Sequence, residues 1–170
     1  SMYVLYMIKK FGLRPLAIHL DNGWNSELAV NNIEKALKKL DVPLFTYVID
    51  WEEFRDLQLA FIKSSIANIE IPTDHAIGAI MFQMASKNNI RHIITGSNLS
   101  SEGIMPSSWM YNPTDLKFIK HINKIFGLRK LNSFPKNSLL NYFYYLFIKK
   151  IKWITILNYL NYDKNKAKNL

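Results

Sequence analysis

Apolar residues along the first hundred positions form two patterns, short continuous runs and repeats of every three or four positions. Residues 2–11 read as the end of a helix that is closed by the glycine after them. Short apolar runs, which are typical of buried strands, occupy residues 14–20, 43–49 and 92–95. Residues 26–40 repeat their apolar side chains every three or four positions, as an amphipathic helix does. This alternation predicts an α/β fold with a parallel sheet and right-handed crossovers.

Two more helices are predicted between the second and third apolar runs. Asp50 and Glu53 have the spacing of a capping box, which begins a helix that extends to about Ala67. Pro72 suits the first turn of the following helix. The stripe expected to face the core of that helix is formed by Ile77, Ile80, Met81, Met84 and Ala85.

The last third of the chain has a looser pattern. Residues 98–112 contain glycine, proline and small polar residues and are predicted to form a loop, whereas 115–126 have a helical pattern. The run 139–148 is aromatic and too short to span a bilayer. The pattern therefore divides the chain into an α/β domain, 1–112, and a helical, basic segment, 113–170.

The positive charge lies almost entirely in the last third. Residues 1–115 hold 10 basic and 12 acidic residues, whereas 116–170 hold 12 basic residues and one acidic residue. Only 4 of the 22 basic residues are arginine, the side chain that phosphate recognition favours. We therefore expect weak, salt-sensitive RNA binding at most and no specific nucleic-acid partner. Aromatic residues beside lysines leave peripheral contact with a membrane surface open.

Several classes of protein are excluded by what the chain lacks. Without cysteine it has no disulfide, thiolate zinc site, iron–sulfur cluster or cysteine nucleophile. It has no long apolar stretch and no signal-peptide pattern, so a cytoplasmic protein is expected. Walker-type, dinucleotide and nucleophile-elbow motifs are missing, and the four histidines have no metal-binding spacing, so no metal ligand is assigned.

Ligands of parallel α/β sheets bind at the carboxyl ends of the strands, so the turns after the first and third predicted strands are the candidate site. Glycine and small polar residues there let backbone N–H groups approach a phosphate or a purine edge, although a purely structural turn has the same composition. The cleft is expected between residues 21–24 and 95–101. Trp24 and Trp109 lie in loops that would line it.

These turns also carry a family resemblance. IHLDNGW resembles the HxDxG segment of the PP-loop ATP pyrophosphatases, and ITGSNLSSEG resembles their later adenine and phosphate loop. The strings DNGWNSELA and DWEEFRDLQLAF are similar to the N-acetyl sugar amidotransferases of that superfamily, over residues 3–110 most clearly. These are bacterial enzymes of surface-polysaccharide and flagellin-glycan synthesis.

The resemblance implies a three-layer, Rossmann-like parallel sheet that lacks its first strand. The signature SGGxDS loop of the superfamily is missing, although Ser1 would fit its last serine. The strand before that loop is central in the superfamily, between the strands expected at 14–20 and 92–95. The family also continues well beyond a segment like NYLNYDKNKAKNL, so the chain is expected to be truncated at both ends.

The resemblance further implies an ATP- and Mg²⁺-dependent enzyme that converts the acetamido group of a free or nucleotide-linked sugar into an acetamidino group. ATP would adenylate the amide, and ammonia from a partner glutaminase would displace AMP. The implied ATP-binding residues are Ser1, His19, Leu20, Asp21, Asn22, Gly23, Thr95, Gly96, Ser97 and Asn98, and those from Leu20 to Gly23 and from Thr95 to Asn98 would hold the adenosine part. The residues expected near substrate or metal, and assigned as catalytic, are Asp74, His75 and Glu102.

Three alternatives stay open. A tRNA-modifying enzyme of the same superfamily would use residues 116–170 to bind RNA. A non-enzymatic remnant would keep the scaffold without the phosphate loop. A membrane-surface module would use the aromatic and lysine-rich run that begins at Leu139.

Overall fold

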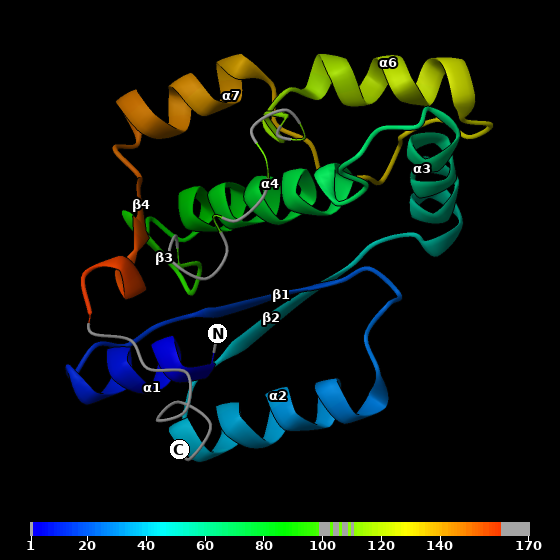
Figure 1. Cartoon of the computed structure of the whole chain (residues 1–170). Helices are drawn as coiled ribbons and strands as arrows, with labels where there is room; N and C mark the ends of the chain where they lie inside the picture. Colours follow the sequence, from blue (N-terminus) through cyan, green and yellow to red (C-terminus); the bar gives the residue numbers. More distant parts are fainter. Residues whose placement is uncertain (1, 99–102, 104–105, 107–108, 110, 161–170) are drawn as a thin grey trace.

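The computed structural model describes residues 2–98, 103, 106, 109 and 111–160. This part of the chain has a mixed α/β architecture with six α-helices and two small parallel sheets of two strands each (Figure 1). Its elements are α1 (Met2–Lys10), β1 (Ala17–Asp21), α2 (Glu27–Leu40), β2 (Leu44–Val48), α3 (Trp51–Lys63), α4 (Ile71–Lys87), β3 (His92–Thr95), α6 (Leu116–Phe126), α7 (Leu139–Phe143), the π-helical segment η2 (Tyr144–Ile148), β4 (Lys152–Thr155) and the 3₁₀ turn η3 (Ile156–Asn158).

The helix ends follow the local signals in the sequence. Gly12, with φ 75°, lies just beyond α1, and the Ser26 hydroxyl accepts the backbone N–H of Ala29 at 3.2 Å to begin α2. Asp50 accepts the N–H of Glu53 at 2.8 Å to begin α3, and Pro72 lies in the first turn of α4. These starts are confirmed, but α3 ends at Lys63 rather than near residue 67.

The strands pair within two separate sheets. In one sheet β1 runs parallel to β2, with Ala17 opposite Leu44 and Asp21 opposite Val48. In the other β3 runs parallel to β4, with Thr95 opposite Thr155. Strands β1 and β3, which were expected in a single sheet, do not pair with each other. Strand β4 was not predicted from the sequence, and its presence means that the segment from residue 113 onward is not helical throughout.

Burial corrects two expectations about these elements. Strand β1 is half-buried along its whole length, and in β3 only Ile93 is fully buried, although both were expected to be buried strands. On α4, Ile77 is 38% exposed, whereas Ala76 and Ala79 are buried. Ile80 and Ala85 are buried as expected, so the buried surface of α4 is broader than the expected stripe, because its two halves pack against different elements.

Three apolar clusters hold these elements together. The largest joins α3, α4 and α6 around Phe54, Phe61 and Ile119, with Phe134 packed from the later chain. A second cluster joins the end of α4 to β3 and η2, and a third packs Leu157 against α1. Because residues after 113 contribute to all three clusters, the carboxyl-terminal part shares the core of the α/β part.

Candidate functional site

The turn after β1 is shaped by its own polar side chains. The carboxylate of Asp21 accepts the backbone N–H of Gly23 at 3.0 Å and an N–H of the Asn25 amide at 3.3 Å. The Asn22 side chain accepts the N–H of Trp24 at 3.3 Å. Side-chain acceptors two residues before the donor form Asx turns, which hold a tight bend without a sheet partner. The polar side chains of Asp21 and Asn22 thus fix the shape of this turn.

An aromatic corner stands beside this turn. The Trp24 ring is exposed and meets the ring of Trp51 edge to face, with 5.4 Å between their centroids. The indole N–H of Trp24 donates to the Gln58 side chain at 2.7 Å, which fixes the ring on α3. Gly23 lies under this corner, because a Cβ atom there would come within 2.5 Å of the Trp51 ring.

The turn after β3 is described only at its beginning. The hydroxyl oxygens of Thr95 and Ser97 lie 3.0 Å apart, and Asn98 is buried. Glu102, which was assigned as catalytic, and Ser1, which was assigned to ATP binding, lie outside the described residues, as do residues 99–101 of the expected cleft.

A cavity of about 740 Å³ separates the two sheets. His19 from β1, Thr95 from β3 and the following Gly96 all line it, so the structure brings these three predicted residues together. The other described members of the predicted set are not among its lining residues: Leu20, Asp21, Asn22, Gly23, Ser97 and Asn98. Most of the lining is aliphatic and comes from α1, α2, β1 and β3.

The lining of this cavity is mostly aliphatic, with a few polar groups. Aliphatic walls with a few polar groups suit a flat, mostly apolar ring such as a nucleobase. Arg14 is the single Lys or Arg on the described lining, and the described residues contain no cluster of three His, Asp or Glu side chains that could hold a metal ion. The described lining is therefore an apolar space with few polar groups and little positive charge to meet a phosphate.

His75 lies in the core on α4. Its Nδ1 is 2.6 Å from the carbonyl oxygen of Pro113, and its Nε2 is 3.3 Å from the N–H of Asn137. These partners fit a neutral ring that donates from Nδ1 and accepts at Nε2. Burial lowers the pKa of His75, which favours the same neutral form. The ring thus joins α4 to two later segments, and its nitrogens are already engaged with the main chain.

Asp74 lies at the surface of the same helix turn. Desolvation by its surroundings, followed by repulsion from Glu70, raises the pKa of this carboxyl above its usual value. Its neighbour Thr73 has a buried hydroxyl oxygen without a hydrogen-bond partner among the described residues. Nothing in the described structure brings Asp74 to the cavity lined by His19 and Thr95.

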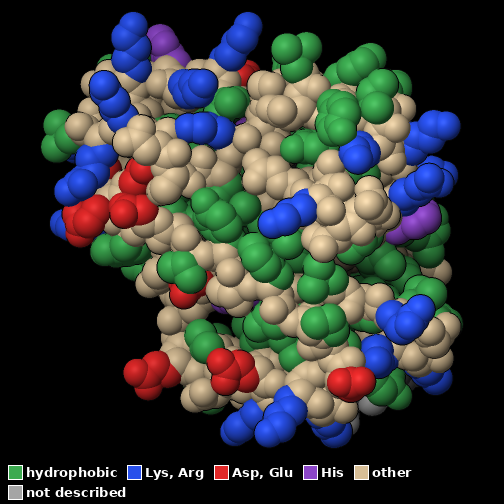
Figure 2. Space-filling model, turned by 180° about the vertical axis from the view of Figure 1, so that it is seen from behind, with side chains coloured by type: hydrophobic (Ala, Val, Ile, Leu, Met, Phe, Trp, Pro, Cys, Tyr) green, Lys and Arg blue, Asp and Glu red, His purple; other side chains and the backbone are tan. Residues whose placement is uncertain are grey.

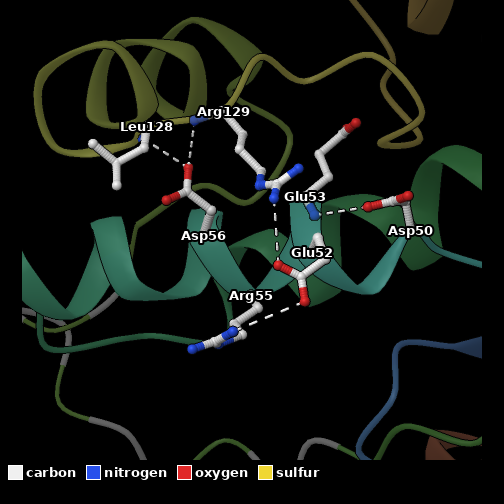
Figure 3. A network of polar contacts seen from close by, with 7 residues as sticks. All are labelled: Asp50, Glu52, Glu53, Arg55, Asp56, Leu128 and Arg129. Carbon is white, nitrogen blue, oxygen red and sulfur yellow. Dashed lines mark hydrogen bonds and ion pairs between the residues drawn. The ribbon is translucent and has the colours of Figure 1, made fainter.

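Two buried carboxylates on α3 were missed by the sequence analysis. Asp56 accepts the backbone N–H groups of Leu128 and Arg129, each at 2.8 Å (Figure 3). Glu53 accepts the N–H of Ser133 at 3.0 Å and of Phe134 at 2.7 Å instead of closing a capping box. The sequence contained one signal for their burial. Both residues lie among the apolar positions of α3 that face the core. They hold the chain after α6 against α3.

Cationic side chains surround a hollow of about 500 Å³ near the end of α6. The basic residues on its lining are Lys120, Lys124, Arg129, Lys130 and Lys136. Among the described residues, no helix is both long and apolar enough to cross a membrane.

Comparisons with protein-family models, with curated proteins and with solved structures find no match to this chain.

Proposed function

We propose that this chain is the nucleotide-binding part of an ATP-dependent amidotransferase that converts a sugar acetamido group into an acetamidino group. The observation that carries the proposal is the cavity shared by His19 of β1, Thr95 of β3 and Gly96, which belong to the two segments that resemble PP-loop motifs. Both turns follow strands that pair in parallel, where α/β proteins bind their ligands.

In this reaction the amide oxygen attacks the α-phosphate of ATP, pyrophosphate leaves, and ammonia from a glutaminase then displaces AMP. The chain's own residues would bind and orient the adenosine part. The base would bind at the end of the cavity where His19, Thr95 and Gly96 lie, and the Thr95 hydroxyl and the Gly96 backbone would offer it hydrogen bonds there. Substrate and phosphate contacts would come from outside the described residues.

The proposal includes a finer fold in which the two sheets are halves of one three-layer parallel sheet. Backbone groups alternate in direction along a strand. The backbone N–H of Ala17 donates to the carbonyl of Pro43, on the β2 side of the strand. The backbone groups of Ile18 and Leu20 therefore point to the opposite side, toward the cavity. In the other sheet, the backbone N–H of Lys152 donates to the carbonyl of Arg91. By the same alternation, the backbone groups of His92 and Ile94 point away from β4, toward the cavity. An additional parallel strand between β1 and β3 would satisfy both edges and fill the aliphatic length of the cavity, and it would leave the end with His19, Thr95 and Gly96 for the nucleotide.

Nucleotide titration followed by NMR or thermal shift tests the proposal. We expect adenosine, AMP and ATP to bind with similar, weak affinity, because the described residues contact the adenosine part alone. His19→Ala and Thr95→Val should weaken binding of all three ligands. Thr46→Val is the matched control, because Thr46 pairs with His19 across the sheet but does not line the cavity. Absence of adenosine binding, or equal loss in the control, would contradict the proposal.

The tRNA-modifying alternative draws on one observation, the basic hollow near α6. Lysines without an arginine-rich or aromatic-lined groove bind mainly through counterion release, so RNA affinity should fall steeply with salt and ignore sequence. Tight binding of one tRNA at physiological salt, measured by filter binding against unrelated RNA, would favour this alternative over the amidotransferase.

A further inference from the structure

Helix α7 and the π-helical segment η2 run on from one another over residues 139–148 and bury little of their surface. Tyr145 is buried and stacks on Phe82 of α4, with ring centroids 5.6 Å apart. Tyr142 is half-buried and meets the same Phe82 ring edge to face at 5.4 Å. These two tyrosines attach the segment to the core, and most of the other side chains point away from it.

The outward side of this segment is apolar, the reverse of an ordinary surface helix. Leu140 is 81% exposed and Phe147 is 64% exposed. Leu139, Phe143 and Ile148 are also more than half exposed. The Phe143 and Phe147 rings lie 4.8 Å apart, so they form one continuous surface. Such a concentration of exposed apolar side chains marks an interaction surface.

Cations border this surface, and acidic residues are absent around it in the sequence. Residues 116–160 contain nine basic residues and no Asp or Glu. Lys149 and Lys150 follow the segment directly, and the Lys149 ammonium lies 5.9 Å from the centre of the Tyr144 ring. Figure 2 shows hydrophobic side chains gathered at the upper right, over α7, with Lys and Arg beside them and no Asp or Glu there.

We propose that this surface, which we call the aromatic face (Leu139, Leu140, Phe143, Phe147 and Ile148), docks on an anionic lipid surface. Apolar side chains enter the boundary between headgroups and acyl chains, while flanking lysines meet lipid phosphates. Aromatic rings such as Tyr144 suit the interfacial layer. A second copy is a poorer occupant, because a symmetric contact would bring the same cations together without acidic partners.

The proposed contact is parallel to the membrane plane. Ten residues are too few to span a bilayer, and the tyrosines that attach the segment to α4 leave the aromatic face free to lie flat. The inference does not depend on the proposed enzymatic function, since no residue of the cavity between the sheets takes part.

Vesicle co-sedimentation of the full chain tests the proposal. We expect binding to phosphatidylcholine vesicles that contain about three parts in ten of phosphatidylglycerol, at least about tenfold stronger than to phosphatidylcholine alone. Binding should weaken markedly at about 0.5 M salt, where surface charges are screened. The double variant Phe143→Ser, Phe147→Ser should lose most of the binding, and Lys149→Gln, Lys150→Gln should lose the preference for anionic lipid.

A matched control exchanges equally exposed apolar residues elsewhere, with Leu28→Ser on α2 and Ile62→Ser on α3. Circular dichroism melting shows whether each variant folds, and light scattering gives its oligomeric state. Equal binding of wild type and the Phe143/Phe147 variant would overturn the proposal. So would equal binding to neutral and anionic vesicles, or a wild-type dimer that this variant converts to a monomer.

Discussion

Gly23 sets the shape of the turn after β1 through its backbone conformation and its lack of a side chain. Its φ of 81° lies in the left-handed region, and a Cβ atom would contact the Trp51 ring. We expect Gly23→Ala to lower the free energy of unfolding by about 1–3 kcal/mol. The Trp51 ring should also shift, which tryptophan fluorescence and near-UV circular dichroism would detect.

Gly12 provides a control for that substitution. It has a similar φ of 75°, but a Cβ atom there would meet nothing within 4 Å. Gly12→Ala should therefore cost the backbone strain without changing the fluorescence of the aromatic corner. An unchanged Trp51 environment in Gly23→Ala would show that the ring does not depend on this close approach.

His75 should make the stability of the chain depend on pH. Because burial lowers its pKa in the folded state, the unfolded chain takes up a proton more readily near the usual histidine pKa of about 6.5. The free energy of unfolding should therefore fall as the pH is lowered from 7.5 through 6.5 to 5.5. Denaturant unfolding at each pH measures this effect.

The variant His75→Gln should remove that pH dependence, because glutamine does not titrate. It should also be less stable at pH 7.5, by about 1–3 kcal/mol, if the Pro113 carbonyl and Asn137 N–H lose their partners. His121→Gln is the control, since His121 is exposed. A pH dependence that persists in His75→Gln would assign it to other groups.

At the scale of elements, α3 organises the segment that follows α6. Glu53 bonds two backbone N–H groups and the Ser133 hydroxyl, at 2.7 to 3.2 Å. Glu53→Ala should leave these donors without partners and lower the free energy of unfolding by about 3 kcal/mol or more. Hydrogen exchange should show faster exchange at Ser133 and Phe134 in particular.

Glu52, the next residue, offers a close control for that prediction. It is half-exposed and pairs with Arg55 at 3.9 Å and Arg129 at 3.5 Å (Figure 3). Surface ion pairs of this kind contribute about 0–1 kcal/mol, so Glu52→Ala should change stability little. Similar losses in both variants would mean that helix propensity, rather than the buried bonds, explains the effect.

At the scale of the whole molecule, the separation of the two sheets leads to a prediction about stability. The edges of β1 and β3 border an aliphatic cavity, and each buried backbone group without a partner costs about 1–3 kcal/mol. The chain as given should therefore be marginally stable, since domains have only about 5–15 kcal/mol in total. An aliphatic strand and a glycine-rich loop fused before α1 should raise both thermal stability and ATP affinity.

Thermal unfolding with and without Mg-ATP measures this prediction on the chain and on the fusion. A fusion of the same length with proline at alternate strand positions is the control, because proline cannot complete the backbone bonding of a sheet. A chain that already melts cooperatively at high temperature, with a strong shift on ATP addition, would show that no additional strand is needed.

The sequence by itself determined the elements whose signals are local. The start of each of α2, α3 and α4 depends on bonds or backbone preferences within a few residues, so a window of sequence contains the cause. The strands β1, β2 and β3 were also predicted locally, because each coincides with a short apolar run. The tight turns at Gly12 and Gly23 also follow from local chemistry.

Only the tertiary structure decided which elements meet. Strand β4 has a short, lysine-flanked sequence, and it becomes a strand because β3, some sixty positions earlier, offers a partner edge. The roles of Glu53 and His75 depend in the same way on backbone groups 38 to 81 positions away. For the candidate site, the two turns could be predicted from the sequence. Contacts across the fold decided that His19, Thr95 and Gly96 share a cavity. They also decided that His75 lies in the core. Long-range packing makes these choices, because a local window contains one side of each contact.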